Sequence, residues 1–491
     1  MLVGQTAINF VTNVISAIFG LLNVVIFTRI FAPAEFGTYV LGAGFAAIAS
    51  TFLVSWLRLP ILREQAKDDG TDIRGIVLPG LLASGLLAPL AYVAARLSSL
   101  GDEASLAAVG LALAIGFFET SQELLRARLQ AFTVMKTTIV RAVLVPVLGV
   151  AFTMVGQTGV LLIASSALAY LLAALAFTRV VWRGTLIRFD ATRLRSLAKA
   201  GMPLTFSLTL LGLSSLIDRF IIALLIGHDA AGQYTAGVDL VRQSLIIPAI
   251  SASAAFMPLA VQILANRGHT AVQEHLDECF ELLLAIALPA CLGFALAAPH
   301  IANVVLGEQF RSMAVAVMPI VSVAVIFQVL SYQYLHISFL LSGRNSFYLL
   351  NTGSVLAFNA ALSYFLILRF GAVGAAWGRL AAELFGFASA LVLTRWAFPI
   401  PLSLRRTARV LAAAVIMAIT VRGVDLAVAL PDKYALAIVI VAGVASYLAM
   451  CLMLDVAAMR THSRDAWFTV QRIFGSKGKG RVASEKPSAR D

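Results

Sequence analysis

Apolar runs of roughly 20 residues recur along nearly the whole chain, with only short polar gaps between them. An α-helix needs a run of about that length to cross the hydrocarbon core of a bilayer, which is roughly 30 Å thick. The composition agrees, since 60% of the 491 residues are hydrophobic and only 13% are charged, unlike those of soluble domains. We therefore predict an all-α integral membrane protein with about 14 transmembrane helices.

The predicted spans form two sets of six, followed by two more. The first set lies near residues 8–28, 36–57, 76–95, 104–118, 138–155 and 159–181. The second set lies near 203–226, 238–264, 280–298, 313–341, 347–368 and 373–397, and the last two spans lie near 410–421 and 434–454. The predicted domains are accordingly two six-helix sets at 1–182 and 201–398, a linker at 183–200, two additional helices at 399–458 and a basic tail at 459–491.

The distribution of lysine and arginine predicts the orientation. An even number of spans puts both termini on the same side of the membrane. If that side is the cytoplasm, the inner loops and the tail carry 27 Lys and Arg residues, and the outer loops carry six. Inner loops of membrane proteins are enriched in these residues, so we predict cytoplasmic termini. The net charge of +12 then indicates topology rather than binding of nucleic acid.

Two short motifs recur at matching places in the two halves. The loops predicted after the first and seventh spans contain Gly-x-Tyr-x-x-Gly, at 37–42 and 232–237. Tight turns of the form Gly-x-x-Gly follow the fifth and eleventh spans, at 156–159 and 371–374. Because an even number of spans separates the copies, we predict parallel repeats related by an axis along the membrane normal, with a binding site at their interface.

The segments outside the spans are short or basic. The joint between the halves, 183–201, interleaves apolar residues with Arg and Lys, which predicts an amphipathic helix along the inner leaflet. The tail at 475–491 is rich in Gly, Ser, Lys and Arg and lacks a pattern that would form a core, so we expect it to be disordered.

Charged side chains inside the predicted spans are candidate functional groups, because charge at mid-bilayer normally faces a cavity or a partner. The seven candidates taken from them are Arg141, Asp218, Arg219, Asp239, Arg242, Arg379 and Glu383. Asp239 with Arg242, and Arg379 with Glu383, are spaced so that each pair can meet on one helix face. Each pair is therefore either an internal salt bridge or part of a functional site. Asp218, Asp239 and Glu383 are the candidates for coupling to a proton or sodium gradient.

Arg141 has no obvious carboxylate on its own helix, so it is the best candidate for a cation that faces a cavity, unless it snorkels to the surface. Arginine holds phosphate through two parallel hydrogen bonds and stays charged at physiological pH, which suits a pyrophosphate head group. The tenth span carries polar residues that either contact sugar or make ordinary hydrogen bonds between helices. They are Gln328, Ser331, Tyr332, Gln333 and Tyr334.

Sequence patterns of catalysis and metal binding are absent. The chain contains no GxSxG, P-loop, HExxH or zinc spacing, and its six histidines are scattered. Its three cysteines show neither disulfide nor metal spacing. We therefore predict a transporter rather than an enzyme, without a cofactor, a metal site or a nucleic-acid partner. A pump driven by ATP alone is disfavoured, because nothing would cradle the phosphates of the nucleotide.

The repeated glycine motifs and the linker from Phe189 and Asp190 to Gly201, Met202 and Pro203 together resemble the polysaccharide-biosynthesis branch of the multidrug/oligosaccharidyl-lipid/polysaccharide (MOP) exporter superfamily. The resemblance covers roughly residues 5–454. It implies two six-helix bundles around a central cavity, with two additional C-terminal helices that form a groove for a polyprenyl tail.

The resemblance also implies a function. Members of this branch flip polyprenyl-pyrophosphate-linked oligosaccharides across the bacterial inner membrane by alternating access, for exopolysaccharide, capsule or O-antigen synthesis. The expected partners are the lipid-linked oligosaccharide, membrane lipid, a polysaccharide polymerase and glycosyltransferases. The residues to which this resemblance assigns pyrophosphate binding are Arg29, Arg58, Arg63, Arg141, Arg219, Arg242 and Arg379.

Three other functions compete with a flippase. A cation-coupled multidrug exporter on the same scaffold would need an unpaired membrane carboxylate, whereas Asp218 and Asp239 each have arginine within three residues. A polymerase or ligase would need a large outer loop, and the longest outer gap is only about a dozen residues. A non-transporting scaffold that recruits glycosyltransferases through the basic tail is the third alternative.

Overall fold

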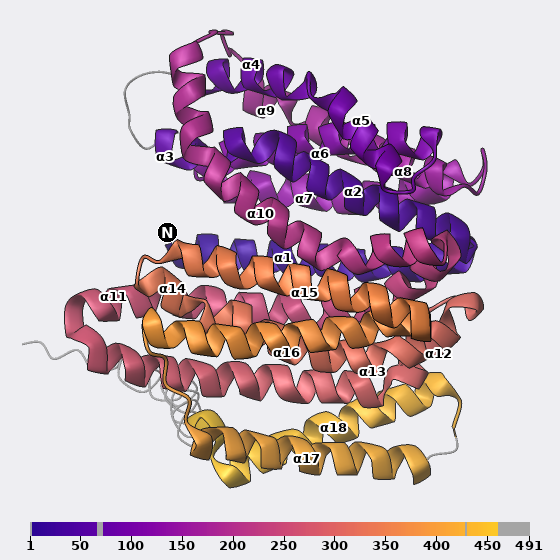
Figure 1. Cartoon of the computed structure of the whole chain (residues 1–491), viewed down its shortest axis with the longest axis vertical. Helices are drawn as coiled ribbons and strands as arrows, with labels where there is room; N and C mark the ends of the chain where they lie inside the picture. The colour runs from indigo at the N-terminus through magenta and orange to yellow at the C-terminus, as the bar shows by residue number, and fades with distance from the viewer. Residues whose placement is uncertain (1, 66–71, 428–429, 460–491) are drawn as a thin grey trace, which may run out of the picture.

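The computed structural model describes residues 2–65, 72–427 and 430–459. Within these residues every regular element is helical and no strand occurs, which confirms the predicted all-α class. The predicted tail at 475–491 lies outside the described residues. Figure 1 shows two bundles, one above the other, with a helical hairpin below the second.

The first half of the chain forms six spanning segments and two short helices. They are α1 (Leu2–Ile30), α2 (Pro33–Arg58), α3 (Ile61–Gln65), the bent pair α4 (Arg74–Gly85) and α5 (Ala88–Leu97), α6 (Asp102–Ala127), α7 (Ala131–Phe152), α8 (Gly159–Ala176) and α9 (Thr178–Trp182). The bend between α4 and α5 is 42°, and the two together are long and apolar enough for one span.

The second bundle and the hairpin complete the described chain. The bundle consists of α10 (Ala191–Leu225), α11 (His228–Leu296), α12 (Ala298–Val305), α13 (Glu308–Leu330), a π-helical turn (Ser331–Leu335), α14 (Ile337–Leu341), α15 (Asn345–Phe370) and α16 (Ala372–Trp396). The hairpin is α17 (Leu404–Ala427) and α18 (Asp432–Leu454), followed by a 3₁₀ turn (Val456–Ala458).

Twelve described helices are long and apolar enough to cross a membrane, and the bent pair α4–α5 makes 13. The difference from the predicted 14 lies in α11, of which only Phe256–Leu296 is counted. Gly268 has φ 81° and ψ −169°, so α11 is two helices joined at a break, and Figure 1 shows it turning back there. The predicted span 238–264 falls in the first arm, where several side chains lie outside the described set.

Each of several helix–helix contacts in the first half of the chain has a counterpart in the second half. In the first bundle α1 packs on α7, α2 on α6, and α7 on α8. The equivalent contacts in the second bundle are α10 with α15, α11 with α13, and α15 with α16. The first helix of each half also crosses to the other bundle, because α1 packs on α11 and α10 packs on α2. This exchange is the arrangement expected of two parallel repeats.

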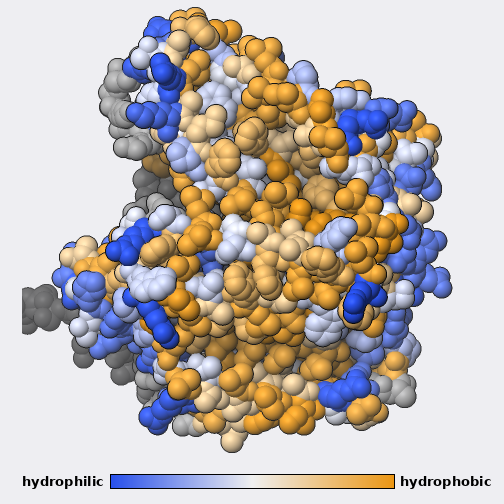
Figure 2. All heavy atoms as spheres, viewed as in Figure 1, coloured by the Kyte–Doolittle hydropathy of each residue, from blue (hydrophilic) through white to orange (hydrophobic). Residues whose placement is uncertain are grey.

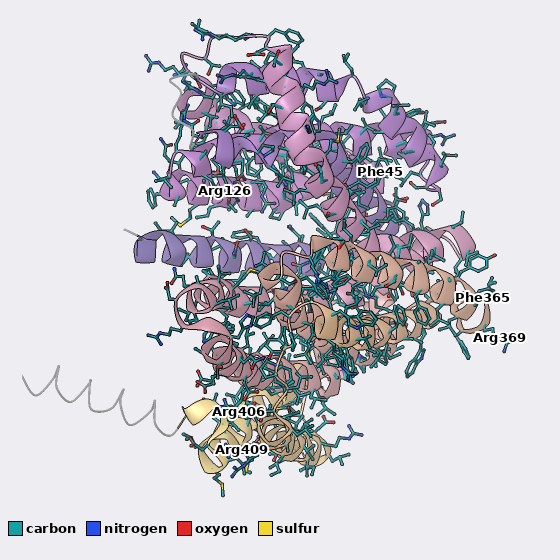
Figure 3. All side chains as sticks on the ribbon, turned by 60° about the vertical axis from the view of Figure 1, so that its left-hand side comes forward. Phe45, Arg126, Phe365, Arg369, Arg406 and Arg409 are labelled. Atoms are coloured by element: carbon teal, nitrogen blue, oxygen red, sulfur yellow. The ribbon has the colours of Figure 1, made fainter. Side chains whose placement is uncertain are left out.

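The two Gly-x-Tyr-x-x-Gly motifs lie in the first turns of α2 and α11, not in the loops in which we expected them. At these turns the two copies of the motif pack directly against each other. A Cβ atom at Gly232 would lie 2.2 Å from the carbonyl oxygen of Pro33, and one at Gly37 would lie 1.9 Å from that of His228. Only glycine permits this approach. Figures 1 and 3 show the bundles meeting at this end and diverging toward the end where α1 begins.

The joint between the halves differs from the amphipathic helix that we expected over 183–201. Residues 183–190 are not helical, and Arg188 donates its backbone N–H to the carbonyl of Gly75 over 3.0 Å. Asp190 then caps α10 by accepting the backbone N–H of Arg193. From Ala191 the helix continues without interruption into the span, because helical hydrogen bonding persists through Gly201 and Pro203.

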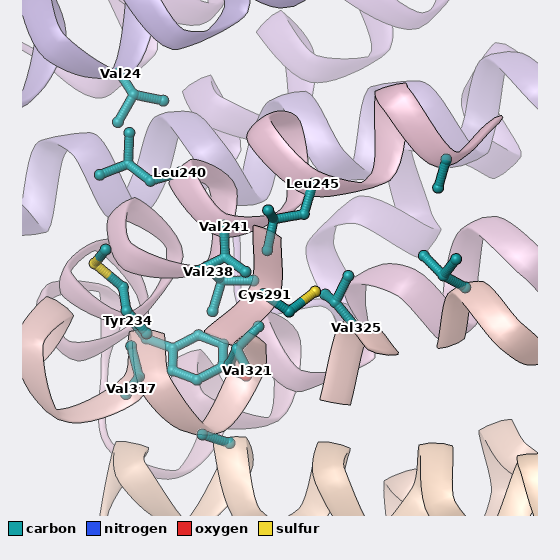
Figure 4. Packing of buried hydrophobic residues seen from close by; sticks show 14 of the residues in the cluster. Val24, Tyr234, Val238, Leu240, Val241, Leu245, Cys291, Val317, Val321 and Val325 are labelled. Atoms are coloured by element: carbon teal, nitrogen blue, oxygen red, sulfur yellow. The ribbon is translucent and has the colours of Figure 1, made fainter. Parts of the chain in front are cut away.

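The interior and the surface are both apolar, as expected where lipid replaces water. Figure 4 shows Tyr234, Val238 and Val321 packed where α11 meets α13, and Tyr234 is only 1% exposed. On the visible face in Figure 2, hydrophobic side chains cover the middle, and hydrophilic ones gather at the left and right ends. This band marks a multi-pass membrane protein.

Candidate functional site

A cavity of about 230 Å³ lies inside the first bundle, and Arg141 is on its wall. The guanidinium donates to the hydroxyl of Tyr170 over 2.8 Å and lies 5.2 Å from the centroid of that ring and 5.9 Å from that of Phe118. Nε of Arg141 is buried without a hydrogen-bond partner. No carboxylate of the described residues lies within 4.0 Å of this arginine, so none of them forms an ion pair with it.

Polar groups from three other helices surround this cavity. Ser16 and Asn23 come from α1, Tyr39 from α2, and Ser166 from α8. Asn23 Oδ1 is buried and unpartnered. Sequence analysis did not identify Asn23 or Tyr170, although each is a polar residue inside an apolar run. The cavity can therefore offer an anion a cation and several hydrogen-bonding groups, which buried charge requires for stable binding.

The matching region of the second bundle holds three arginines and three carboxylates, and all of these except Arg242 form ion pairs within the described structure. Arg379 lies 3.1 Å from Glu383 and 3.6 Å from Asp218, which confirms the expected pair on α16. Arg219 forms an ion pair with Asp239. Asp239 and Arg242, which their spacing would allow to meet, do not form an ion pair in the described structure, since Asp239 takes a partner from α10.

Three of these charges, on Arg242, Arg379 and Asp218, also have uncharged hydrogen-bond partners. Arg242 donates to the Ser215 carbonyl over 2.8 Å, and Arg379 to that of Ser214 over 2.7 Å. Asp218 accepts the side-chain amide of Asn359 over 2.6 Å. The cavity that remains is about 10 Å³, enough for one water molecule. Asn359 escaped the sequence analysis because only the fold brings α15 beside α10.

The other predicted arginines do not join Arg141. Arg29 is exposed at the end of α1 and donates to the Val304 carbonyl over 2.6 Å. Arg58 forms an ion pair with Glu119 of α6. The side chain of Arg63 lies outside the described set. The structure therefore distributes the six candidates whose side chains it describes over several places instead of gathering them into one site.

The five polar residues that are candidates for contacting sugar also lie in different surroundings. Gln328 lines the small cavity of the second bundle, and Ser331 has a buried, unpartnered hydroxyl. Gln333 accepts the hydroxyl of Ser253 over 2.6 Å, and Tyr334 donates to the Pro401 carbonyl over 2.8 Å. Tyr332 packs its ring edge on His336, 4.8 Å between centroids. Gln333 and Tyr334 thus make ordinary hydrogen bonds to other parts of the chain. Such bonds were the alternative to sugar binding.

An apolar groove of about 560 Å³ runs between the hairpin and the second bundle. Met417 and Val421 of α17 and Val439 and Tyr447 of α18 form one side of it. Helices α1, α11 and α12 complete the wall, the first of them through Leu21 and Val25. We expected a groove at the two additional helices, but their sequence did not indicate that α1 contributes to it. Within the described chain no group of three or more His, Cys, Asp or Glu residues is placed to hold a metal ion.

Comparison with known proteins agrees with this architecture. The family model described as "Polysaccharide biosynthesis protein" matches residues 2–264, more than half of the chain. No curated protein is significantly similar in sequence.

Two groups of solved structures share the fold. The lipid II flippase MurJ in an inward closed conformation has a TM-score of 0.76 at 13% identity, over 90% of this chain and 97% of that one. A multidrug resistance MATE family transporter of the MOP superfamily, in an inward-facing conformation, has a TM-score of 0.58 at 17% identity, over 80% of this chain and 95% of that one. The chain therefore belongs to the polysaccharide biosynthesis protein family, and it is a membrane protein with the fold that MurJ and MATE transporters share.

Proposed function

We propose that this protein flips a polyprenyl-pyrophosphate-linked oligosaccharide across the bacterial inner membrane, for synthesis of an exopolysaccharide, capsule or O-antigen. The observation that carries the proposal is the un-neutralised guanidinium of Arg141 on the wall of a cavity with room for a ligand. A pyrophosphate diester placed there would accept hydrogen bonds from Arg141, including one from the unpartnered Nε.

The remaining parts of the substrate suit the other features. A polyprenyl tail fits the apolar groove, whose α1 wall also contributes Ser16 and Asn23 to the Arg141 cavity. Alternating access would open and close the two bundles about the glycine crossing at Gly37 and Gly232. In this scheme both termini are cytoplasmic, and a polymerase and glycosyltransferases act on the same lipid-linked oligosaccharide.

Of the candidate arginines, the proposal assigns pyrophosphate to Arg141 alone. Arg219 and Arg379 already pair with carboxylates, and Arg242 borders a cavity of about 10 Å³, which is too small for a pyrophosphate. The three carboxylates considered for ion coupling are also engaged. Asp239 and Glu383 are ion-paired, and Asp218 accepts the Asn359 amide beside Arg379. A cation-coupled drug exporter would have to break these contacts, so the flippase is the better-supported function.

The test is the accumulation of polyprenyl-pyrophosphate oligosaccharide on the cytoplasmic face of a deletion strain. We expect wild-type protein to relieve the accumulation, Arg141→Ala to leave it, and Arg141→Lys to relieve it in part, because lysine keeps the charge but not the planar fork. Arg369→Ala, which removes an exposed arginine at the end of α15 (Figure 3), is the matched control. A deletion strain without accumulation would refute the flippase, and full relief by Arg141→Ala would refute the role of Arg141.

A further inference from the structure

A second, more polar pocket of about 860 Å³ lies where α11, α17 and the chain after α18 meet. Three arginines at the start of α17 line it, and Figure 3 shows Arg406 and Arg409 there, at the outer edge of the molecule. It is the largest of the four cavities described here, and neither the cavity of Arg141 nor the apolar groove shares a lining residue with it.

Arg406 organises this pocket but is already neutralised. Its guanidinium lies 2.9 Å from Asp277 and 3.0 Å from Glu281, and Glu281 also accepts the backbone N–H of Ala457 over 2.9 Å. Glu281 is 4% exposed, so this pair fixes the start of α17 against α11. The result is a rigid floor for the pocket, in which the neighbouring side chains carry the free charge.

Those neighbours carry charges of both signs. Arg405 and Arg409 are four residues apart and therefore share one face of α17, and neither forms an ion pair or hydrogen bond within the described structure. Glu278 of α11 lines the same pocket and is likewise unpaired among the described residues. A ligand that carries a phosphate and an amine would satisfy both kinds of group.

The surroundings favour a lipid as the source of that headgroup. Phe256 and Leu282 supply apolar walls beside the charged ones. Leu282 is followed one turn later on α11 by Ile286, which lines the apolar groove, a step of about 6 Å along the axis. On α17, Arg409 and Met417 are two turns apart, about 12 Å. The polar pocket and the apolar groove are consecutive parts of one seam.

We propose that this pocket binds the headgroup of a resident membrane phospholipid of the phosphatidylethanolamine class. Its phosphodiester lies against Arg405 and Arg409, its ammonium faces Glu278, and its acyl chains follow the seam between α11 and α17. Basic pockets at the membrane surface are known places for lipid headgroups, and here the carboxylate selects an amine-bearing one. This site is independent of which substrate the protein flips.

The proposal can be tested by native mass spectrometry of the purified full-length protein with added phosphatidylethanolamine or phosphatidylglycerol. We expect Arg405→Gln combined with Arg409→Gln to weaken binding of both lipids roughly tenfold, since each surface arginine contributes appreciably to lipid attraction. Arg422→Gln, at the other end of α17 and 62% exposed, is the matched control and should bind as wild type does. Equal binding by the double variant and the wild type would overturn the site.

Two further measurements separate the parts of the proposal. Glu278→Gln should lower the preference for phosphatidylethanolamine over phosphatidylglycerol several-fold without lowering the affinity for phosphatidylglycerol. An unchanged preference would overturn the assignment of an amine-bearing headgroup. Inorganic phosphate should not displace the lipid, because it cannot follow the apolar seam. Displacement by phosphate would show that the pocket takes a free anion instead. Arg405→Lys with Arg409→Lys keeps both charges and should retain most of the binding even if the glutamine variants fold poorly.

Discussion

The two bundles have matching architecture but opposite treatment of buried charge. Tyr39 and Tyr234 are the tyrosines of the two glycine motifs, and each lines the cavity of its own bundle. Around Tyr39 the cavity is about 230 Å³ and holds one arginine without a carboxylate. Around Tyr234 it is about 10 Å³, and the region holds three arginines and three carboxylates, all of which except Arg242 are ion-paired within the described structure. One repeat thus keeps an open cavity beside an arginine that forms no ion pair in the described structure, whereas the ion-paired region of the other repeat leaves almost no cavity.

The largest expected effect comes from breaking the neutral network of the second bundle. Arg379→Ala would leave Glu383 and Asp218 buried beside an empty space, at 2% and 4% exposure. Removing one partner of a buried ion pair typically costs about 3–5 kcal/mol. We expect a correspondingly large loss in the free energy of unfolding, measured by thermal aggregation of the protein in detergent. If Arg379→Ala were as stable as wild type, the buried carboxylates of the second bundle would not depend on their ion pairs, and this contrast with the Arg141 cavity would be refuted.

The second-largest loss of stability is expected at the crossing of α2 and α11, where the two repeats use the same glycine motif. Gly232→Ala places a Cβ 2.2 Å from the Pro33 carbonyl oxygen, and Gly37→Ala places one 1.9 Å from that of His228. Overpacking of this kind costs about 1–3 kcal/mol, and we expect similar losses from both variants. Gly110→Ala is the control, since its Cβ meets nothing within 4 Å and alanine favours a helix. Destabilisation by only one of the two motif variants would contradict the symmetry.

Arg141→Ala should change stability less than Arg379→Ala or the two glycine substitutions. It removes one hydrogen bond to Tyr170 and the contacts with two rings, but it also removes a buried Nε that has no partner. These contributions oppose each other, so we expect a net loss of about 1 kcal/mol or less. The same thermal measurement checks this, and a loss as large as that of Arg379→Ala would mean that Arg141 is structural rather than reserved for a ligand.

The smallest effect tests the hairpin, which only the second half of the chain carries. His300 of α12 lies 2.7 Å from Asp425 of α17 and 2.7 Å from Asp432 of α18, one through each ring nitrogen. The hydrogen bond to Asp425, and then that to Asp432, raises the pKa of His300 against the opposing effect of burial. Because the folded pKa is raised, the stabilisation is fully present below the ordinary histidine pKa of about 6.5 and is lost as the pH rises through the folded value.

We therefore expect the stability difference between wild type and His300→Ala to shrink as the pH is raised from mildly acidic to alkaline, measured by thermal unfolding across that range. Arg422 also pairs with Asp425 over 2.9 Å, and Lys433 follows Asp432, so both remain in place as constant charges in the two proteins. A difference that does not change with pH would refute the titration of His300.

Several properties of this protein were determined by the sequence alone. Runs of about 20 apolar residues require membrane-spanning helices, because unpaired backbone groups cannot be exposed to lipid. The duplicated glycine motifs identified two repeats, and the four-residue spacing of Arg379 and Glu383 predicted their ion pair, since such residues share a helix face. Each of these inferences depends only on residues that are close together in the sequence or that recur at a fixed spacing.

The partners of the remaining charges were decided only by the tertiary structure. Asp239 could reach Arg242 on its own helix, but the packing of α10 on α11 offers Arg219 instead. The sequence likewise placed Arg141 without a carboxylate on its own helix, but only the packing of α7 and α8 against α1 and α2 shows that a cavity remains and that none of the described carboxylates reaches this arginine. The physical reason is that helices fix the spacing along one axis, whereas the space between helices depends on which of their faces meet.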